Sequence, residues 1–200
     1  MTQKFTLYFC LLFTVISFAQ KTKMTIVYKE GKTLEGYGKI LGENRIKFWH
    51  SNKSKPVKWS YKDLKSVNYI KIHTNNKTLM YQFVRIDDTR IKLLKLTVSG
   101  AINLYERVTN SAPMYMAGGG MNGMGYWSGG GTINNYYVKR KGEVKATHLG
   151  SNQLFTKNFK KAMSEYVKDC NELVVKIQNK EYKKKHLEQI VEYYNSNCSN

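Results

Sequence analysis

The sequence has little of what catalysis needs. Its four histidines are far apart and form no HExxH motif or His/Cys cluster with metal-ligand spacing: His50, His73, His148 and His186. It has no Gly-x-Ser-x-Gly elbow, and no cysteine carries a local protease signature. The adjacent carboxylates Asp87 and Asp88 are explained by a turn. These absences predict a non-enzymatic protein without catalytic residues or a cofactor.

A long hydrophobic run occurs only at the start of the chain. Lys4 precedes an apolar run of about 14 residues, and Ser17 and Ala19 supply the small residues of a cleavage site before Gln20. The run is too short for a stable membrane span of about 20 residues. We therefore expect residues 1–19 to be a secretory signal peptide and the mature chain to contain no transmembrane helix.

Cysteine is scarce, with three in the whole chain. Cys10 lies inside the expected signal peptide, so its removal leaves Cys170 and Cys198. An even number of cysteines in an oxidising compartment predicts a disulfide between them. It would close a loop of about 28 residues and stabilise the fold by roughly 3–4 kcal/mol in the chain-entropy model. The alternative is a pair of free thiols.

Acidic residues are few beside the basic ones. The 33 Lys and Arg outnumber the 14 Asp and Glu, which gives a formal net charge of +19. Loss of Lys4 with the signal peptide would lower this charge by one, to +18. Most of the excess is lysine, and neither arginine forks nor a clustered basic face is visible, so nucleic acid is not an expected partner. The lysines are either a solvated surface or an attraction for anionic lipid or polysaccharide.

Short strand patterns fill most of the chain. β-Branched and aromatic residues alternate with turn residues at eight-to-twelve-residue spacing. About ten strands are expected, over residues 24–28, 34–41, 45–49, 57–61, 67–72, 79–84, 91–98, 102–108, 133–140 and 144–149. The pattern predicts a β-rich α+β fold in which residues 20–150 form an antiparallel meander, either a curled sheet or a sandwich. Gly36 and Gly38 indicate a bend or a close approach of another backbone.

Residues 151–200 carry the only strong helix pattern. Apolar residues recur at helical spacing over residues 159–167, 173–177 and 187–194. Thr156 and Asn171 are candidate N-caps for the first two helices. We expect this helical segment to pack on the β domain, with the Cys170–Cys198 bridge folding the segment back on itself.

Residues 112–132 interrupt the strands with a glycine- and methionine-rich stretch. The preferred interpretation is a flexible hairpin loop between two strands, because glycine tracts seldom order without a partner. A second is a Cu(I) site, because thioethers suit this soft ion; its candidate ligands are Met114, Met116, Met121 and Met124. A phosphate-cradling loop is disfavoured because no Gly-Lys-Ser/Thr follows. A partner-binding loop that uses adaptable methionine is the remaining interpretation.

Aromatic residues near lysines give one more hypothesis. Trp49, Trp59 and Tyr61 with neighbouring lysines are a candidate face for a sugar or for lipid A, since aromatic rings stack and lysines meet phosphate. The alternative is that these three residues fill the core of the sheet.

Several segments carry a resemblance to known proteins: residues 61–67, 136–140, 142–143, 159–161, 169–174 and 190–195. Together they resemble a loose group of uncharacterised exported bacterial proteins, in which a β-rich body ends in a short helical segment with an Asp-Cys-Pro-Glu-Leu-like motif. This chain has Asn171 in the place of that proline. The resemblance implies export and this architecture, and it implies no activity.

The sequence therefore predicts an exported, non-enzymatic binding protein of the cell envelope or the medium, with an anionic lipid or glycan as its ligand. The expected location is the periplasm, the outer-membrane surface or the extracellular space. One alternative is a structural or assembly component of the envelope that contacts another protein. A further alternative is Cu(I) binding through the methionine-rich loop.

Overall fold

The computed structural model describes residues 21–42, 44–110, 114–116, 126–128, 132–151 and 159–199. The expected signal peptide and the candidate cap Thr156 lie outside these residues. Within them, none of the helices combines the length and the hydrophobicity that crossing a lipid bilayer requires.

The described chain is mostly strand. The strands are β1 (Thr22–Tyr28), β2 (Thr33–Ile40), β3 (Arg45–Trp49), β4 (Val57–Ser60), β5 (Val67–His73), β6 (Thr78–Arg85), β7 (Ile91–Val98), β8 (Ile102–Asn110), β9 (Met114–Met116), β10 (Tyr126–Ser128), β11 (Thr132–Arg140) and β12 (Thr147–Ser151). The helices are α2 (Phe159–Tyr166), α3 (Asn171–Gln178), the 3₁₀ turn η1 (Lys184–His186) and α4 (Leu187–Asn197).

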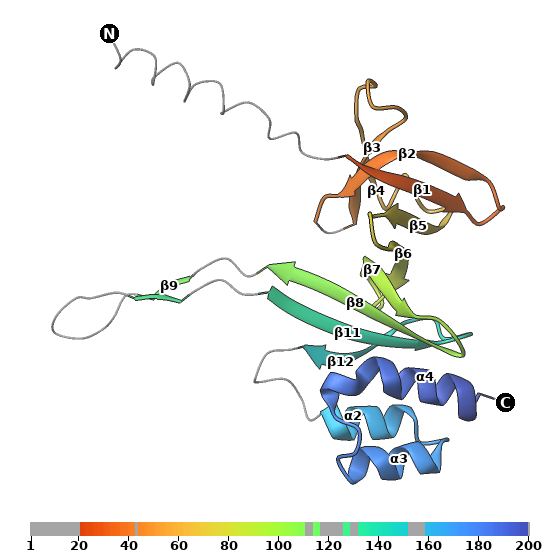
Figure 1. The fold of residues 1–200 in the computed structure, drawn as a ribbon, viewed down its shortest axis with the longest axis vertical. Helices are drawn as coiled ribbons and strands as arrows, with labels where there is room; N and C mark the ends of the chain where they lie inside the picture. Colours follow the sequence, from red (N-terminus) through yellow and green to blue (C-terminus); the bar gives the residue numbers. More distant parts are fainter. Residues whose placement is uncertain are drawn as a thin grey trace.

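Ten strands form one sheet in the order β12-β11-β8-β7-β6-β5-β1-β2-β3-β4, and every pairing is antiparallel. Figure 1 shows this sheet running from β1–β4 at one end to β11 and β12 at the other, where the helices lie. The expected β-rich α+β meander is confirmed, in its form as a curled sheet.

The register assigns side chains to two faces of this sheet. Face A carries Ile26, Leu93 and Leu104, because successive cross-strand pairs connect their positions through β5, β6 and β7. Face B carries Tyr105, which is adjacent to Leu104 on β8. It also carries Trp49, which cross-strand pairs connect through Tyr37 to Lys23, three residues before Ile26 on β1. These two faces decide which residues meet.

The first seven strands curl toward face A. Their core is a buried cluster of face-A side chains and one turn residue: Met24, Ile26, Ile46, Phe48, Leu64, Val67 and Ile70. The side chain of Asn44, in the turn between β2 and β3, forms hydrogen bonds with the backbone of β7. In the sheet, three strands (β1, β5 and β6) lie between β2 and β7. Such a contact requires the sheet to roll up around this core.

The other end of the sheet curls the opposite way. The loop between β11 and β12 folds over face B, where Ala146 packs with Val84, Leu94, Tyr105 and Tyr137. The backbone N–H of Ala146 donates to the carbonyl oxygen of Arg85 at 2.8 Å. The expected strand over residues 144–149 therefore begins late, at Thr147, because residues 144–146 cross the sheet and leave Val144 75% exposed.

The three helices cover face A of β8, β11 and β12. Their shared core is one cluster of buried side chains: Ile102, Leu104, Val138, Leu149, Met163, Val167, Cys170, Leu173, Ile177, Leu187, Ile190, Val191 and Tyr194. Asn195 ties α4 to the sheet, since its side chain accepts a bond from the N–H of Ile102 and donates one to the carbonyl of the same residue.

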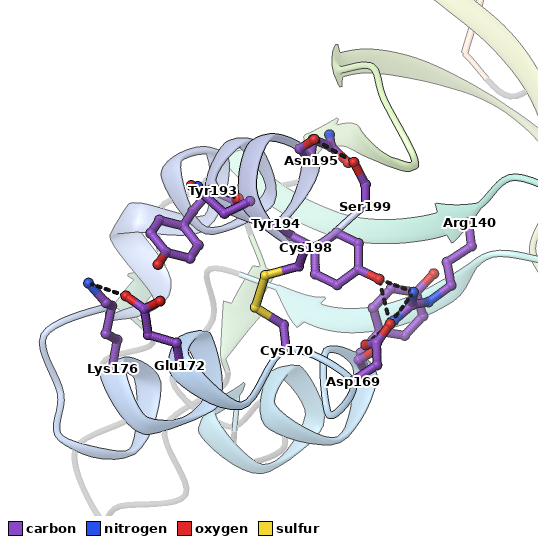
Figure 2. Close-up of a disulfide and its surroundings, with 12 residues drawn as sticks. Arg140, Asp169, Cys170, Glu172, Lys176, Tyr193, Tyr194, Asn195, Cys198 and Ser199 are labelled. Atoms are coloured by element: carbon purple, nitrogen blue, oxygen red, sulfur yellow. Dashed lines mark hydrogen bonds and ion pairs between the residues drawn. A yellow bond between two sulfur atoms is a disulfide. The ribbon is translucent and has the colours of Figure 1, made fainter.

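The expected disulfide is present. Cys170 precedes α3 and Cys198 follows α4, and their Cα atoms lie 5.8 Å apart (Figure 2). The prediction that Asn171 caps α3 is wrong. The carbonyl of Cys170 accepts the N–H of Val174, which makes Cys170 the N-cap residue. Asn171 is therefore the first residue inside the helix.

The glycine- and methionine-rich stretch connects two paired strands, as a hairpin loop should. β8 and β11 pair along nine residues each. The described part of the stretch also contains β9 and β10, which pair with each other, so regular structure continues into a region expected to be a loop. Figure 1 shows β9 beyond the ends of β8 and β11, away from the body of the sheet.

Candidate functional site

The middle of face A holds a cleft between two of the cores. The core under the curled strands ends at Leu93 on β7, and the core under the helices begins at Leu104 on β8. Between these positions lies a cleft of about 560 Å³, within the range of 300–1,000 Å³ that is usual for ligand sites. Its lining comes from the β2–β3 turn, β6, β7 and β8.

One wall of the cleft is held in place by Asn44. This residue has a φ of 58°, a left-handed conformation that asparagine tolerates better than most residues. Its Nδ2 donates to the carbonyl of Ile91 at 2.5 Å, and its Oδ1 accepts the N–H of Leu93 at 2.9 Å. The pairing of β7 with β8 starts only at Lys95. The amide of Asn44 therefore satisfies backbone groups of β7 before β8 reaches it, and the cleft opens where the two strands diverge.

The floor of the cleft contains an ion pair. Lys95 and Glu106 are opposite each other on β7 and β8, and Nζ lies 2.7 Å from Oε2, with the two side chains 27% and 13% exposed. Beside them, burial raises the pKa of the Tyr81 hydroxyl; Glu106 raises it further and Lys95 opposes this. A partly buried pair of this kind fixes two long side chains and leaves the floor rigid.

The cleft as a whole is basic and partly apolar. Lys92 and Arg107 also line it, from positions of β7 and β8 that alternate onto face B, so these two cations border the gap between the diverging strands while Lys95 and Glu106 pair on its floor. Apolar surface comes from Leu93, from the ring of Tyr81 and from Val108, which is 54% exposed. This combination suits a ligand with an anionic head and an apolar body.

The aromatic face proposed from the sequence is divided by the sheet. Trp59 stacks on Phe48 with ring centroids 5.1 Å apart, and Tyr61 packs on Phe83 at 5.2 Å, so both contribute to the core on face A. Trp49 lies on face B. The three rings therefore do not form one surface.

The four methionines of the candidate Cu(I) site are only partly described. Met114 and Met116 are the two ends of β9, while Met121 and Met124 lie outside the described residues, so the Cu(I) set stays a prediction. Throughout the described part of the chain, no three His, Cys, Asp or Glu side chains gather as a metal site would need.

The adjacent carboxylates Asp87 and Asp88 lie in a turn, as expected. Oδ1 of Asp87 accepts the backbone N–H groups of Thr89 and Arg90 at 3.0 and 2.7 Å. Desolvation raises the pKa of Asp87, but the hydrogen bonds from Arg90 and Thr89 outweigh it and bring the pKa to about 2. Such a carboxylate stays ionised and holds the turn.

The residues of the cleft escaped sequence reasoning because four separate segments supply them. One signal was available. The reversal at residues 99–100 predicts that residues on either side of it pair, which brings Lys95 toward Glu106. The contact of Asn44 with β7 has no comparable local signal, since 47 residues separate Asn44 from Ile91.

Comparison with known proteins adds no relative: no protein-family model matches the chain, and neither a curated protein nor a solved structure shows significant similarity to it.

Proposed function

We propose that the protein is exported and acts as a non-enzymatic binding protein of the cell envelope, whose cleft on face A holds an anionic lipid. The single observation that carries this proposal is the cleft itself, in which the cations Lys92 and Arg107, at the edge where β7 and β8 diverge, adjoin the apolar residues Leu93 and Val108. An anionic head would meet Lys92 and Arg107, and its apolar tail would lie against Leu93 and Val108.

Two further observations support export and the choice of ligand. The Cys170–Cys198 disulfide is a bond that persists in oxidising compartments and is rare in reducing ones. The formal net charge, +19 for the whole chain and +18 once Lys4 leaves with the signal peptide, raises the local concentration of any anionic ligand around the molecule.

The test is calorimetric titration of the disulfide-bonded protein with dodecyl phosphate below its micellar concentration, with dodecyl maltoside as the uncharged counterpart. We expect dodecyl phosphate to bind and the maltoside to bind at least about tenfold more weakly, because loss of a charge–charge contact in a partly buried site costs about 1.4 kcal/mol or more. Binding should weaken as salt is added.

Two double variants locate the site. K92Q/R107Q removes two positive charges from the cleft, and K62Q/K65Q removes the same charge from the exposed turn after β4. The first variant should weaken dodecyl phosphate binding about tenfold and the second should not. Equal binding of the two detergents, equal effects of the two variants, or hydrolysis of the ligand would each overturn the proposal.

A second candidate is an assembly component of the envelope. It is favoured by β9 and β10, whose pairing continues beyond β8 and β11 and away from the body of the sheet (Figure 1). If this extension contacts another envelope protein, replacing residues 111–131 with Asn-Gly should abolish co-purification of a stoichiometric partner. An unchanged partner would exclude this role for the extension.

A further inference from the structure

Face B of the curled strands carries a straight row of polar and aromatic residues. Successive cross-strand pairs connect them: Thr78 opposes His73, His73 opposes Lys23, Lys23 opposes Tyr37, and Tyr37 opposes Trp49. Neighbouring strands lie about 4.8 Å apart, so a row across five strands extends for about 19 Å. This row is longer than one small ligand and suits an extended chain.

A groove lies along the middle of the row, at His73, Lys23 and Tyr37. It has a volume of about 580 Å³ and is lined by eight residues, of which two are Met24 and Gly36. The six polar or aromatic residues define the outer groove: Lys23, Thr25, Glu35, Tyr37, His50 and His73. The outer groove and the cleft lie on opposite faces of the sheet and share no lining residue. A ligand in one is therefore not a ligand in the other.

The polar groups of the outer groove are held in fixed positions. Nε2 of His73 lies 3.0 Å from Oγ1 of Thr25, and Nδ1 lies 3.1 Å from Oγ1 of Thr78. Each hydroxyl has further capacity to donate or accept. Glu35 is exposed and offers a carboxylate, and the ring of Tyr37 is half-buried. Fixed donors and acceptors beside an aromatic ring match a ligand that is rich in hydroxyl groups.

The charge around the outer groove is strongly positive. Lys21 and Lys47 hold their Nζ atoms 5.2 and 5.1 Å from the ring of Trp49, and Lys71 lies 5.4 Å from the ring of Tyr69. With Lys23 these make four cations, against the carboxylate of Glu35. The complementary occupant is therefore acidic.

A membrane surface fits less well than a polysaccharide. Trp49, the large ring at the end of the row, is only 8% exposed, and the ammonium groups of Lys21 and Lys47 lie over it. An interfacial tryptophan that inserts among lipids has to present its ring. What the row presents instead is an alternation of ammonium, hydroxyl, imidazole and phenol groups.

We propose that the outer groove binds an acidic polysaccharide, lying across strands β5, β1, β2 and β3. Its carboxylate or sulfate groups would meet Lys23 and the lysines around Trp49, and its sugar hydroxyls would meet Glu35, Thr25 and His73. This site is independent of the proposed lipid cleft and does not rest on it.

The probe is a hexamer of galacturonic acid, with its methyl ester as the uncharged counterpart, titrated into the disulfide-bonded protein. The variant K23Q/Y37A alters two residues whose side chains are exposed or half-buried, and the circular dichroism spectrum checks that it folds. We expect this variant to bind the acidic hexamer at least about fivefold more weakly, since each lost contact is worth up to about 1 kcal/mol at an exposed site. The turn variant K62Q/K65Q should bind as the unaltered protein does.

Three results would overturn the proposal. One is equal binding of the acid and its methyl ester. The second is an equal loss in the turn variant, which would mean attraction by net charge alone. The third is tighter binding of anionic vesicles than of the hexamer, with the same sensitivity to K23Q/Y37A. The lipid titration of the cleft is a separate measurement, so failure of one proposal is distinguished from failure of the other.

Discussion

Gly36 and Gly38 point to the same side of β2, but different atoms stand where their side chains would begin. A Cβ on Gly36 would lie 2.4 Å from the carbonyl oxygen of Trp49 and 2.5 Å from Cζ of Phe48. A Cβ on Gly38 would lie 2.5 Å from Sδ and Cε of Met24. A carbonyl in a paired strand cannot move alone, whereas the end of a methionine side chain has several rotamers.

We therefore expect Gly36→Ala to lower the free energy of unfolding by about 1–3 kcal/mol and Gly38→Ala to lower it by less. Urea denaturation of the two variants, monitored by tryptophan fluorescence, measures the difference. The two variants serve as matched controls, since both add one methyl group to the same strand. A larger loss for Gly38→Ala would contradict this account.

For single residues, the sequence predicts the close approach at the two glycines, but it does not predict which face each tryptophan occupies. Two glycines at alternate positions are enough to predict a close approach on one side of a strand. Whether Trp49 and Trp59 share a face depends on the register of β3 against β4, where Ile46 opposes Trp59. The loop between these strands sets that register, and alternation within each strand does not reveal it.

Among the elements, Arg140 at the end of β11 connects the sheet to two helices. Its guanidinium forms two bonds with the carboxylate of Asp169, at 2.9 and 2.7 Å, and a third with the carbonyl of Tyr166 at 2.7 Å. Tyr194 of α4 donates to the same carboxylate at 2.5 Å, and its ring lies 4.8 Å from the guanidinium carbon (Figure 2). Asp169 precedes Cys170, so this network and the disulfide lie side by side.

The network makes stability depend on pH in the acid range. Hydrogen bonds from Arg140, followed by that from Tyr194, lower the pKa of Asp169 below its ordinary value of 3.8, although desolvation opposes them. A lowered folded-state pKa stabilises the fold above pH 3.8, and this contribution is lost as the pH falls through the folded-state pKa. The Asp169 side chain is about half exposed, so solvent screening limits the contribution to less than about 1 kcal/mol.

The substitution Asp169→Asn should therefore reduce stability at pH 7, and the gap from the unaltered protein should close as the pH falls below 3.8. Urea denaturation between pH 7 and pH 2 measures this gap. Asp88→Asn is the control, because its ion pair with Lys145 is far more exposed and should produce a smaller gap. A gap for Asp169→Asn that stays constant down to pH 2 would refute the role of the carboxylate.

The existence and order of the elements followed from periodicity, but some of their limits did not. The ten strands of the large sheet and the three α-helices were all predictable from apolar spacing. The start of β12 was not, because the contact of Ala146 with Arg85 draws residues 144–146 away from strand pairing. Tertiary contacts of this kind leave no trace in local sequence.

On the scale of the whole molecule, the sheet curls toward face A at one end and toward face B at the other. The strands β6 and β7 belong to both curls, since Tyr81 and Leu93 pack in the first core and Val84 and Leu94 in the core on face B. Two halves that share their central strands cannot separate without breaking those strands. We expect the described chain to unfold as one unit.

Truncation of either distant core tests this expectation. Ile70 and Val191 are both 0% exposed, the first under the curled strands and the second under the helices. Ile70→Ala should lower the free energy of unfolding by about 2–5 kcal/mol. The denaturation midpoint measured by the fluorescence of Trp49 and Trp59 should fall by the same amount as the midpoint measured by helical circular dichroism. Trp127→Phe in the background removes the third tryptophan signal. Val191→Ala should likewise shift both midpoints together, and a shift confined to one probe would show two independent halves.

The double curl itself was beyond sequence reasoning. A meander of about ten strands is compatible with a sandwich or a curled sheet. The choice rests on Asn44 reaching β7 and Ala146 reaching Arg85, two contacts between segments more than 40 residues apart in the chain.

The position of the disulfide has a consequence for proteolysis. The bridge joins residues that are 28 positions apart and enclose α3, η1 and α4. A protease that cuts once within this enclosed stretch leaves two polypeptides attached through sulfur, so the clipped protein migrates as a single band until a thiol reagent releases the C-terminal piece. A molecule damaged there keeps its covalent continuity.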